Sequence, residues 1–246
     1  MEFFKTPAGI AVFTVVAVIV AVFVIDVNYK YFFKYVLDFI FALIALILLA
    51  PVICVFAVII KIKLNSHGGG TVFEREYFYG AKGKIIVLRS FAVKAENGED
   101  FGAFSKYLNS SAVKYFPRVL DILCGRISIV GVKPMKISDA CFVSDEFDGK
   151  FAARPGVINP LIGKCDKETD YEQIFALELA YVKKRELFKD IWYAVKNAVY
   201  KIRGEKFEFG ESDLNTYAKT LLVSGRISEN DYNRAIEYER SVIAGN

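Results

Sequence analysis

The sequence predicts a membrane-anchored protein with one sizeable globular domain. The chain has 246 residues, 54% of them hydrophobic, and two long apolar runs lie close to the N-terminus. The remainder has the composition of an ordinary soluble domain. We therefore expect an N-terminal transmembrane helix over residues 1–28, a second membrane segment over 29–64, a globular domain over 65–204, and a C-terminal helical hairpin over 205–246.

The first apolar run, residues 8–25, is predicted to be a transmembrane helix. It has 18 residues without a charge, and a bilayer core about 30 Å thick needs about 20 helical residues. A cleaved signal peptide is the alternative. Against it, only Lys5 supplies a basic side chain before the run, and no cleavage site with small residues follows before Asp26.

The second apolar run, residues 39–60, has 22 uncharged residues but is expected to return to the side from which it enters. Pro51 lies near its middle, lacks the N–H of a helical hydrogen bond, and biases Ala50 away from helical geometry. Lysines flank both ends, so the positive-inside rule favours the cytoplasm for both. They are Lys30, Lys34, Lys61 and Lys63. We expect a re-entrant helix–break–helix; a kinked span through the bilayer is the alternative.

The net charge and the spacing of the cysteines indicate what kind of molecule the protein binds and in which compartment its main domain lies. The net charge of +4 is mild, and the isoelectric point of about 8.7 lies below the range of nucleic-acid-binding domains. The four cysteines are scattered without a C-x-x-C spacing, so we interpret them as free thiols in a reducing compartment. Together with the lysines that flank the second apolar run, which favour the cytoplasmic face and its anionic lipids, these features predict a lipid partner, no nucleic-acid partner and a cytoplasmic main domain.

Five stretches resemble one family in order and spacing. They are FKYVLDFIFALIALILLAPVICVFAVIIKI (33–62), GKIIVLRSF (83–91), GRISIVGVKP (125–134), ARPGVIN (153–159) and LELAYVKKRELFKDI (177–191). Together they resemble the bacterial sugar transferases, the monotopic phosphoglycosyl transferases, although Ala50 stands where that family usually has serine before proline. The resemblance implies an α/β-type, helix-dominated domain with few short strands at the bacterial cytoplasmic (inner) membrane.

The resemblance also implies a reaction. Family members join a sugar-1-phosphate from a nucleotide diphosphate sugar to a polyprenyl phosphate, a step in exopolysaccharide, O-antigen or glycoprotein glycan assembly. It thus implies a UDP-sugar and polyprenyl phosphate as partners, and Mg²⁺ beside an Asp-Glu pair whose aspartate forms a covalent phosphosugar intermediate. Carboxylates suit this chemistry because they are phosphoryl nucleophiles and hard oxygen ligands for Mg²⁺.

The chain departs from the family pattern where the chemistry is expected. The Asp-Glu pair falls on Lys114 and Tyr115, the preceding arginine on Asn109, and the start of a Thr-Gly-Trp motif on Asn159. An ammonium group cannot ligate Mg²⁺ and would repel it. We therefore name no catalytic residue, metal ligand or cofactor. Two functions remain open: an impaired sugar-phosphate transferase, and a non-catalytic binding or scaffold partner of an active transferase.

Basic residues around these positions are predicted to form a metal-free phosphate pocket, because Lys and Arg bind phosphate oxygens directly. The alternative is a set of solvated surface charges. The substrate-binding set is Arg89, Ser90, Arg118, Arg126, Lys133, Pro134 and Arg154. Asp121, about two helical turns beyond Lys114, is the first candidate for a substitute carboxylate.

The C-terminal region is predicted to be a helical hairpin. Residues 213–243 contain two helical patterns separated at Ser224, and Ser228 with Asp231 forms a weak capping box for the second helix. We interpret the hairpin as an interaction element for a protein partner.

Overall fold

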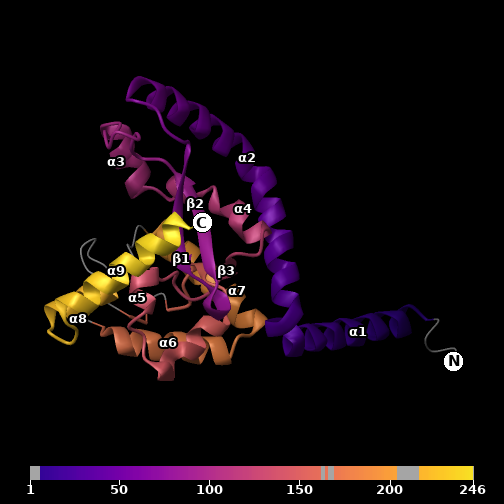
Figure 1. Ribbon diagram of the computed structural model, residues 1–246. Helices are drawn as coiled ribbons and strands as arrows, with labels where there is room; N and C mark the ends of the chain where they lie inside the picture. The colour runs from indigo at the N-terminus through magenta and orange to yellow at the C-terminus, as the bar shows by residue number, and fades with distance from the viewer. Residues whose placement is uncertain (1–5, 162–163, 166–168, 204–215, 246) are drawn as a thin grey trace.

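The computed structural model describes residues 6–161, 164–165, 169–203 and 216–245. Two long helices form the N-terminal part, and a helix-rich domain with two small sheets packs beside the second helix (Figure 1). Residues 205–215, which begin the expected C-terminal hairpin, lie outside the described part of the chain. The expectation of a helix-dominated protein is confirmed.

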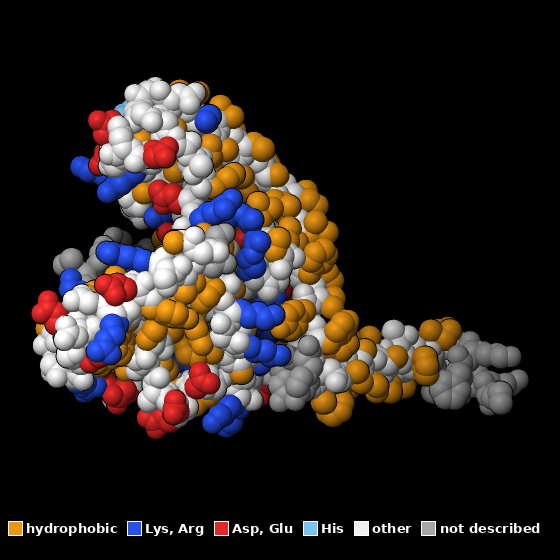
Figure 2. Space-filling view, viewed as in Figure 1, with side chains coloured by type: hydrophobic (Ala, Val, Ile, Leu, Met, Phe, Trp, Pro, Cys, Tyr) orange, Lys and Arg blue, Asp and Glu red, His pale blue; other side chains and the backbone are white. Residues whose placement is uncertain are grey.

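The two N-terminal helices are α1 (Pro7–Asn28) and α2 (Lys34–Ser66), joined by a π-helix, η2 (Tyr29–Phe33). Both are long and apolar enough to cross a membrane. Protein covers 0% of the most apolar window of α1 and 6% of that of α2. Apolar side chains accordingly line α1 and the outer side of α2 (Figure 2). These surfaces suit lipid, and the protein is membrane-associated.

Helix α2 differs from the expected helix–break–helix. It continues from Lys34 to Ser66 with Pro51 inside it, and Figure 1 shows it curving around the globular domain. A proline inside a helix removes one backbone hydrogen bond and bends the helix, and neighbouring packing can hold the two halves together. Here the same domain packs along α2 on both sides of Pro51, so the chain bends without leaving helical geometry.

Packing against α2 occurs through two hydrophobic clusters. One, near the C-terminal end of α2, includes Ile60 and Leu64 together with Phe91. The other, near its N-terminal end, includes Ala42 together with Leu88 and other residues. Three helical segments complete this layer: α3 (Ala103–Ser110), the 3₁₀-helix η4 (Ala112–Tyr115) and α4 (Arg118–Leu123). The domain therefore touches α2 close to both of its ends.

Four short strands form two sheets among the described residues. Strands β1 (Phe73–Tyr79) and β2 (Ile85–Phe91) are antiparallel, with Phe73 opposite Phe91, whereas β3 (Ser128–Val130) and β4 (Gly156–Ile158) are parallel. Between β3 and β4 the chain forms α5 (Ile137–Ala140) and the 3₁₀-helix η5 (Asp145–Ala152).

Two glycines let the chain segments at β3 and β4 approach closely. A Cβ atom on Gly156 would lie 2.0 Å from the backbone nitrogen of Gly131, and one on Gly131 would lie 2.6 Å from the carbonyl oxygen of Arg154. Any side chain at either position would force the two segments apart. The glycines of the GRISIVGVKP and ARPGVIN stretches thus permit the close approach, and the parallel pairing puts the residues after β3 and β4 at the same end of the sheet.

The remaining helices are α6 (Tyr171–Lys183), α7 (Leu187–Ile202), α8 (Tyr217–Val223) and α9 (Glu229–Ala244). The predicted cap of the last helix is confirmed, because the Asp231 N–H donates to Ser228 Oγ at 3.1 Å. The α8–α9 hairpin packs on its own domain. Ala218 N–H donates to Asp139 at 2.9 Å, and Ser138 N–H donates to Glu239 at 2.8 Å.

Helix α7 has an exposed apolar face close to the membrane helices. Phe188, Ile191, Trp192 and Val195 are exposed at helical spacing. The start of α7 contacts the end of α1, where Leu187 N–H donates to Asp26 at 3.2 Å. The apolar surface of the membrane helices is therefore continued by α7.

Candidate functional site

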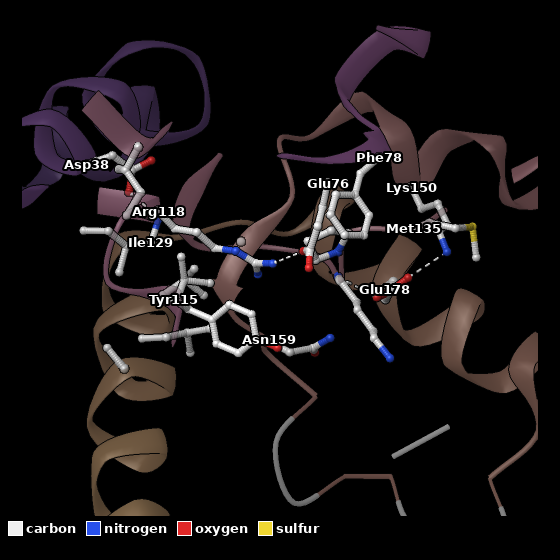
Figure 3. Close-up of a pocket in the computed structure, with 18 of the residues that line it drawn as sticks. Asp38, Glu76, Phe78, Tyr115, Arg118, Ile129, Met135, Lys150, Asn159 and Glu178 are labelled. Carbon is white, nitrogen blue, oxygen red and sulfur yellow. Dashed lines mark hydrogen bonds and ion pairs between the residues drawn. The ribbon is translucent and has the colours of Figure 1, made fainter. Parts of the chain in front are cut away.

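A broad pocket opens where β1, η4, α4, α6 and the segments after β3 and β4 meet (Figure 3). Its lining includes Glu76, Tyr115, Arg118, Asn159 and Glu178. Each of these side chains comes from a different segment: Glu76 from β1, Tyr115 from η4, Arg118 from α4, Asn159 from the chain after β4 and Glu178 from α6. The α8–α9 hairpin also contributes to the lining.

Lys114 and Tyr115 end η4. The Tyr115 side chain lines the pocket and is 40% exposed. The Nζ of Lys114 donates to Asn109 Oδ1 at 3.3 Å and lies 5.6 Å from the centre of the Tyr115 ring. The positions where the family's carboxylates are expected therefore offer a phenol and an ammonium group.

Arg118 is the best-defined basic side chain of the pocket. Its Nη2 donates to Glu76 Oε2 at 2.8 Å, and its guanidinium carbon lies 4.3 Å from the centre of the Tyr115 ring. The Nε–H of the same group is buried and has no hydrogen-bond partner. Glu76 and Tyr115 hold the guanidinium in place but leave this donor unused.

The residues after β3 and β4 form another wall. Lys133 and Pro134 line the pocket, and the backbone N–H of Lys133 donates to Glu178 at 3.0 Å. Asn159 Oδ1 accepts a hydrogen bond from Leu161 N–H at 2.7 Å, whereas its Nδ2 is buried without a partner. The hydrogen bond from Leu161 thus fixes the orientation of the Asn159 amide, and the Nδ2 group remains without a partner.

A buried ion pair closes the α6 side of the pocket. Lys150 Nζ lies 2.9 Å from Glu178 Oε2, and both side chains are almost fully buried. Burial lowers the pKa of Lys150, an effect that the neighbouring Glu178 carboxylate opposes. The same Nζ lies 3.6 Å from the centre of the Phe175 ring. The charge of Glu178 is therefore neutralised by Lys150, whose ammonium group is buried against the Phe175 ring.

The predicted phosphate-binding residues divide into two groups. Of the described residues, Arg118, Lys133 and Pro134 line the pocket. Arg154 pairs with a lining residue instead: its Nη2 donates to Asp38 at 2.7 Å, and its guanidinium stacks 3.7 Å from the centre of the Tyr35 ring. Asp38 is buried and also accepts from Ser128 Oγ at 2.7 Å. Arg154 therefore joins the domain to α2.

Arg89 and Arg126 converge on Asp121 rather than on the pocket. Asp121 is 0% exposed. It accepts from Arg89 N–H at 2.8 Å, Arg89 Nη1 at 2.7 Å and Arg126 Nη1 at 2.9 Å. Ser90, the remaining predicted residue, is buried, and its hydroxyl has no partner. An inaccessible carboxylate paired with two arginines is a structural group, so this geometry does not support Asp121 as a substitute nucleophile.

The pocket does not fit the Mg²⁺ that the family resemblance implies. Within the described ranges, no three His, Cys, Asp or Glu side chains lie close enough together to hold a metal ion. Glu76 and Glu178 are each paired with a basic group, and Mg²⁺ requires oxygen ligands in near-octahedral geometry. We therefore derive no chemical step through a metal ion here.

Sequence reasoning missed the acidic partners of this site. Glu76 lies on an alternating strand and Glu178 on an amphipathic helix, where a carboxylate is normally a solvated surface group. Nothing local marks either residue, because their partners Arg118 and Lys150 are distant in sequence. Asn159 did carry a signal, since it replaces the first residue of a family motif.

Comparison with known proteins agrees with the resemblance. Residues 29–204 match the sequence model of the bacterial sugar transferase family. The chain is similar to the UDP-glucose:undecaprenyl-phosphate glucose-1-phosphate transferase of Escherichia coli K12, with 25% identity over 63% of this chain and 37% of that protein. Similarity to the protein of the same name from Caulobacter vibrioides is 26% identity over 64% of this chain and 65% of the relative.

The match thus spans less than two thirds of the length of each of these relatives. The family model includes α2 and the four strands among the described residues, whereas α8 and α9 lie beyond it. The family model covers well over half of the sequence, and the chain belongs to the bacterial sugar transferase family.

Proposed function

We propose that this chain acts in glycan assembly at the bacterial cytoplasmic membrane as a family member whose sugar-1-phosphate transfer is impaired. The name of its relatives describes glucose-1-phosphate transfer between UDP-glucose and undecaprenyl phosphate. A UDP-sugar and a polyprenyl phosphate are accordingly the proposed ligands. In this proposal the chain binds such phosphate compounds and turns them over poorly or not at all.

The observation that carries the proposal is the chemistry at Lys114 and Tyr115. The family resemblance implies a carboxylate nucleophile at this place, and neither Lys114 nor Tyr115 offers a carboxylate. Glu76 and Glu178, which line the same pocket, are already in ion pairs. Loss of a nucleophile in a concerted site can lower the rate by a factor on the order of a million.

The test is turnover by the full-length protein in lipid nanodiscs that contain polyprenyl phosphate. We expect no release of UMP from UDP-sugars in the presence of Mg²⁺, whereas the Escherichia coli relative, prepared in the same way, should release it. UMP release by the wild-type chain at a comparable rate would overturn the proposal. The variants Lys114→Ala and Tyr115→Phe would then show whether these positions take part.

We also propose that α2 is re-entrant, with both ends on the cytoplasmic side. Two contacts support this topology: Lys34 near the start of α2 pairs with Asp190, and Ile60 and Leu64 near its end pack against Phe91. A domain outside the bilayer cannot reach both ends of a straight helix that crosses it. The curvature of α2 lets its middle enter the lipid while its ends stay with the domain.

Single cysteines at Tyr31 and Lys63, in a background without the native cysteines, test the topology. Both should resist an impermeant thiol reagent added outside intact cells and react once the membrane is opened. A cysteine in the exposed loop at Lys82 serves as the cytoplasmic control. Labelling of only one of the two flanking sites from outside would establish a span through the bilayer and rule out the re-entrant arrangement.

The C-terminal hairpin remains a proposed site for a protein partner, but only through its outer face. The inner face is occupied by contacts with α5, as the bonds of Asp139 and Glu239 indicate. A partner would therefore contact exposed α9 side chains such as Tyr238 and Arg234.

A further inference from the structure

We infer that Arg118 and Asn159 form a phosphate-binding subsite that works without a metal ion. This inference deepens the proposed function and rests on it, because it concerns how a member without the family's carboxylates holds its ligand. Neither residue is needed to keep the other in place, so each supplies separate evidence.

The first evidence is a pair of unused donors. Arg118 Nε and Asn159 Nδ2 are buried nitrogen atoms without a hydrogen-bond partner, and both residues line the same pocket. In the view of Figure 3 the Asn159 amide lies beside the Tyr115 ring, below the Arg118 guanidinium. Buried donors are nearly always satisfied in folded proteins, because an unmade hydrogen bond is destabilising. Two such donors on residues that line one pocket are groups that a ligand with acceptor oxygens would satisfy.

The second evidence is that both donors are held in fixed orientations. Arg118 is fixed by Glu76 at one nitrogen and by the Tyr115 ring at its face. The Asn159 amide is fixed by the hydrogen bond from Leu161 to its oxygen, which leaves only N–H groups to face a ligand. A site with donors already oriented loses little side-chain entropy when a ligand binds.

The third evidence is the local charge, which favours an anion. The unpaired groups are N–H donors, and the glutamates Glu76 and Glu178 of the lining are paired with Arg118 and Lys150. Lys133 lines the same pocket and adds a positive charge. Guanidinium and amide N–H groups bind phosphate oxygens by short, charge-assisted hydrogen bonds. The ligand class is therefore a phosphate ester, supplied by a nucleotide diphosphate or by a polyprenyl phosphate headgroup.

Binding of UDP and of a short-chain polyprenyl phosphate to the full-length protein in nanodiscs tests this subsite. At least one of the two should bind in EDTA, and its affinity should fall as salt concentration rises. Arg118→Gln and Asn159→Asp should each lower the affinity for that ligand by about tenfold or more. Asn159→Asp keeps the oxygen that accepts from Leu161, so it tests the donor without removing the local fold. Arg240→Gln, an equal charge change on exposed α9, should leave binding unchanged.

The substitution Glu76→Gln should change phosphate affinity in opposite directions for binding without a metal ion and for binding through one. Without a metal, loss of the Glu76 carboxylate removes a competitor for Arg118, and phosphate affinity should rise severalfold. If Glu76 instead ligated a metal ion, the same substitution would weaken binding. The direction of this change therefore separates direct phosphate binding from metal-assisted binding in one variant.

The outcomes separate this inference from the proposed function. A strict Mg²⁺ requirement, wild-type affinity in both Arg118→Gln and Asn159→Asp, or no binding of either ligand would overturn the subsite, even if turnover is absent. Binding in EDTA that depends on both residues would support it, even if UMP release showed that the chain is an active transferase.

Discussion

Two regions of this protein differ in whether their buried polar groups have partners. In the membrane-side network, which joins α2 to the domain through Asp38, Ser128, Arg154, Lys34 and Asp190, buried charges are paired. Elsewhere in the pocket, which Lys34, Asp38 and Asp190 of the network also line, Arg118 and Asn159 retain buried donors without partners. The network consists of residues that match the family pattern, whereas Asn159 in the pocket and Lys114 and Tyr115 in η4 depart from it. The two regions therefore differ in how closely they follow that pattern.

The membrane-side network should give the largest stability effect. Arg154→Leu leaves the buried Asp38 carboxylate without its charged partner, which should lower the free energy of unfolding by about 3–5 kcal/mol. Lys189→Met, which breaks the exposed pair with Glu186, is the control and should leave the free energy of unfolding nearly unchanged. Chemical unfolding in detergent measures both. Equal losses in the two variants would show that Asp38 and Arg154 do not form a buried structural link.

The ion pair of the pocket should matter less to the fold. Glu76→Gln removes the charge opposite Arg118, but both side chains keep some exposure, so the free energy of unfolding should change by about 1 kcal/mol or less. Chemical unfolding in detergent allows this change to be compared with that of Arg154→Leu. A loss as large as that of Arg154→Leu would mean that the pocket pair is structural, and the contrast between the two regions would disappear.

A smaller, pH-dependent effect is expected where the hairpin meets the domain. Burial raises the pKa of Asp139, so the folded state holds this proton more tightly than the unfolded state. Its contribution to stability is fully present below the unfolded pKa of about 3.9 and is lost as pH rises through the folded pKa. Asp139→Asn keeps the oxygen that accepts from Ala218. It should slightly raise stability at pH 7 relative to wild type and flatten this part of the pH profile. A clear loss of stability at pH 7 would show that the ionised carboxylate is needed.

Much of the fold could be predicted from the sequence, because its strongest signals are local. Uncharged runs of 18 and 22 residues, close to the length that crosses a bilayer core, indicate α1 and α2, and the capping residue Ser228 marks the start of α9. The continuity of α2 through Pro51 could not be predicted, since it depends on how the domain packs along both halves of the helix.

The candidate site could be predicted only in part. Lys114 and Tyr115 were evident from their place in the family pattern, and Arg118 and Lys133 do line the pocket. Arg154 was predicted to bind phosphate, whereas the structure pairs it with Asp38, 116 positions away in the sequence. A lone sequence shows which residues are charged but not which charges meet, and those pairings decide which groups remain open to a ligand.

The central claim is that no carboxylate of this pocket forms a covalent bond to the phosphorus of a sugar phosphate. Intact-mass measurement of the full-length protein in nanodiscs, after incubation with UDP-sugars and Mg²⁺ in the absence of polyprenyl phosphate, tests it most directly. We predict no mass increase, while the Escherichia coli relative serves as the comparison under the same conditions. A stable addition of one sugar phosphate to the wild-type chain, lost on substitution of a single side chain in the pocket, would contradict the claim.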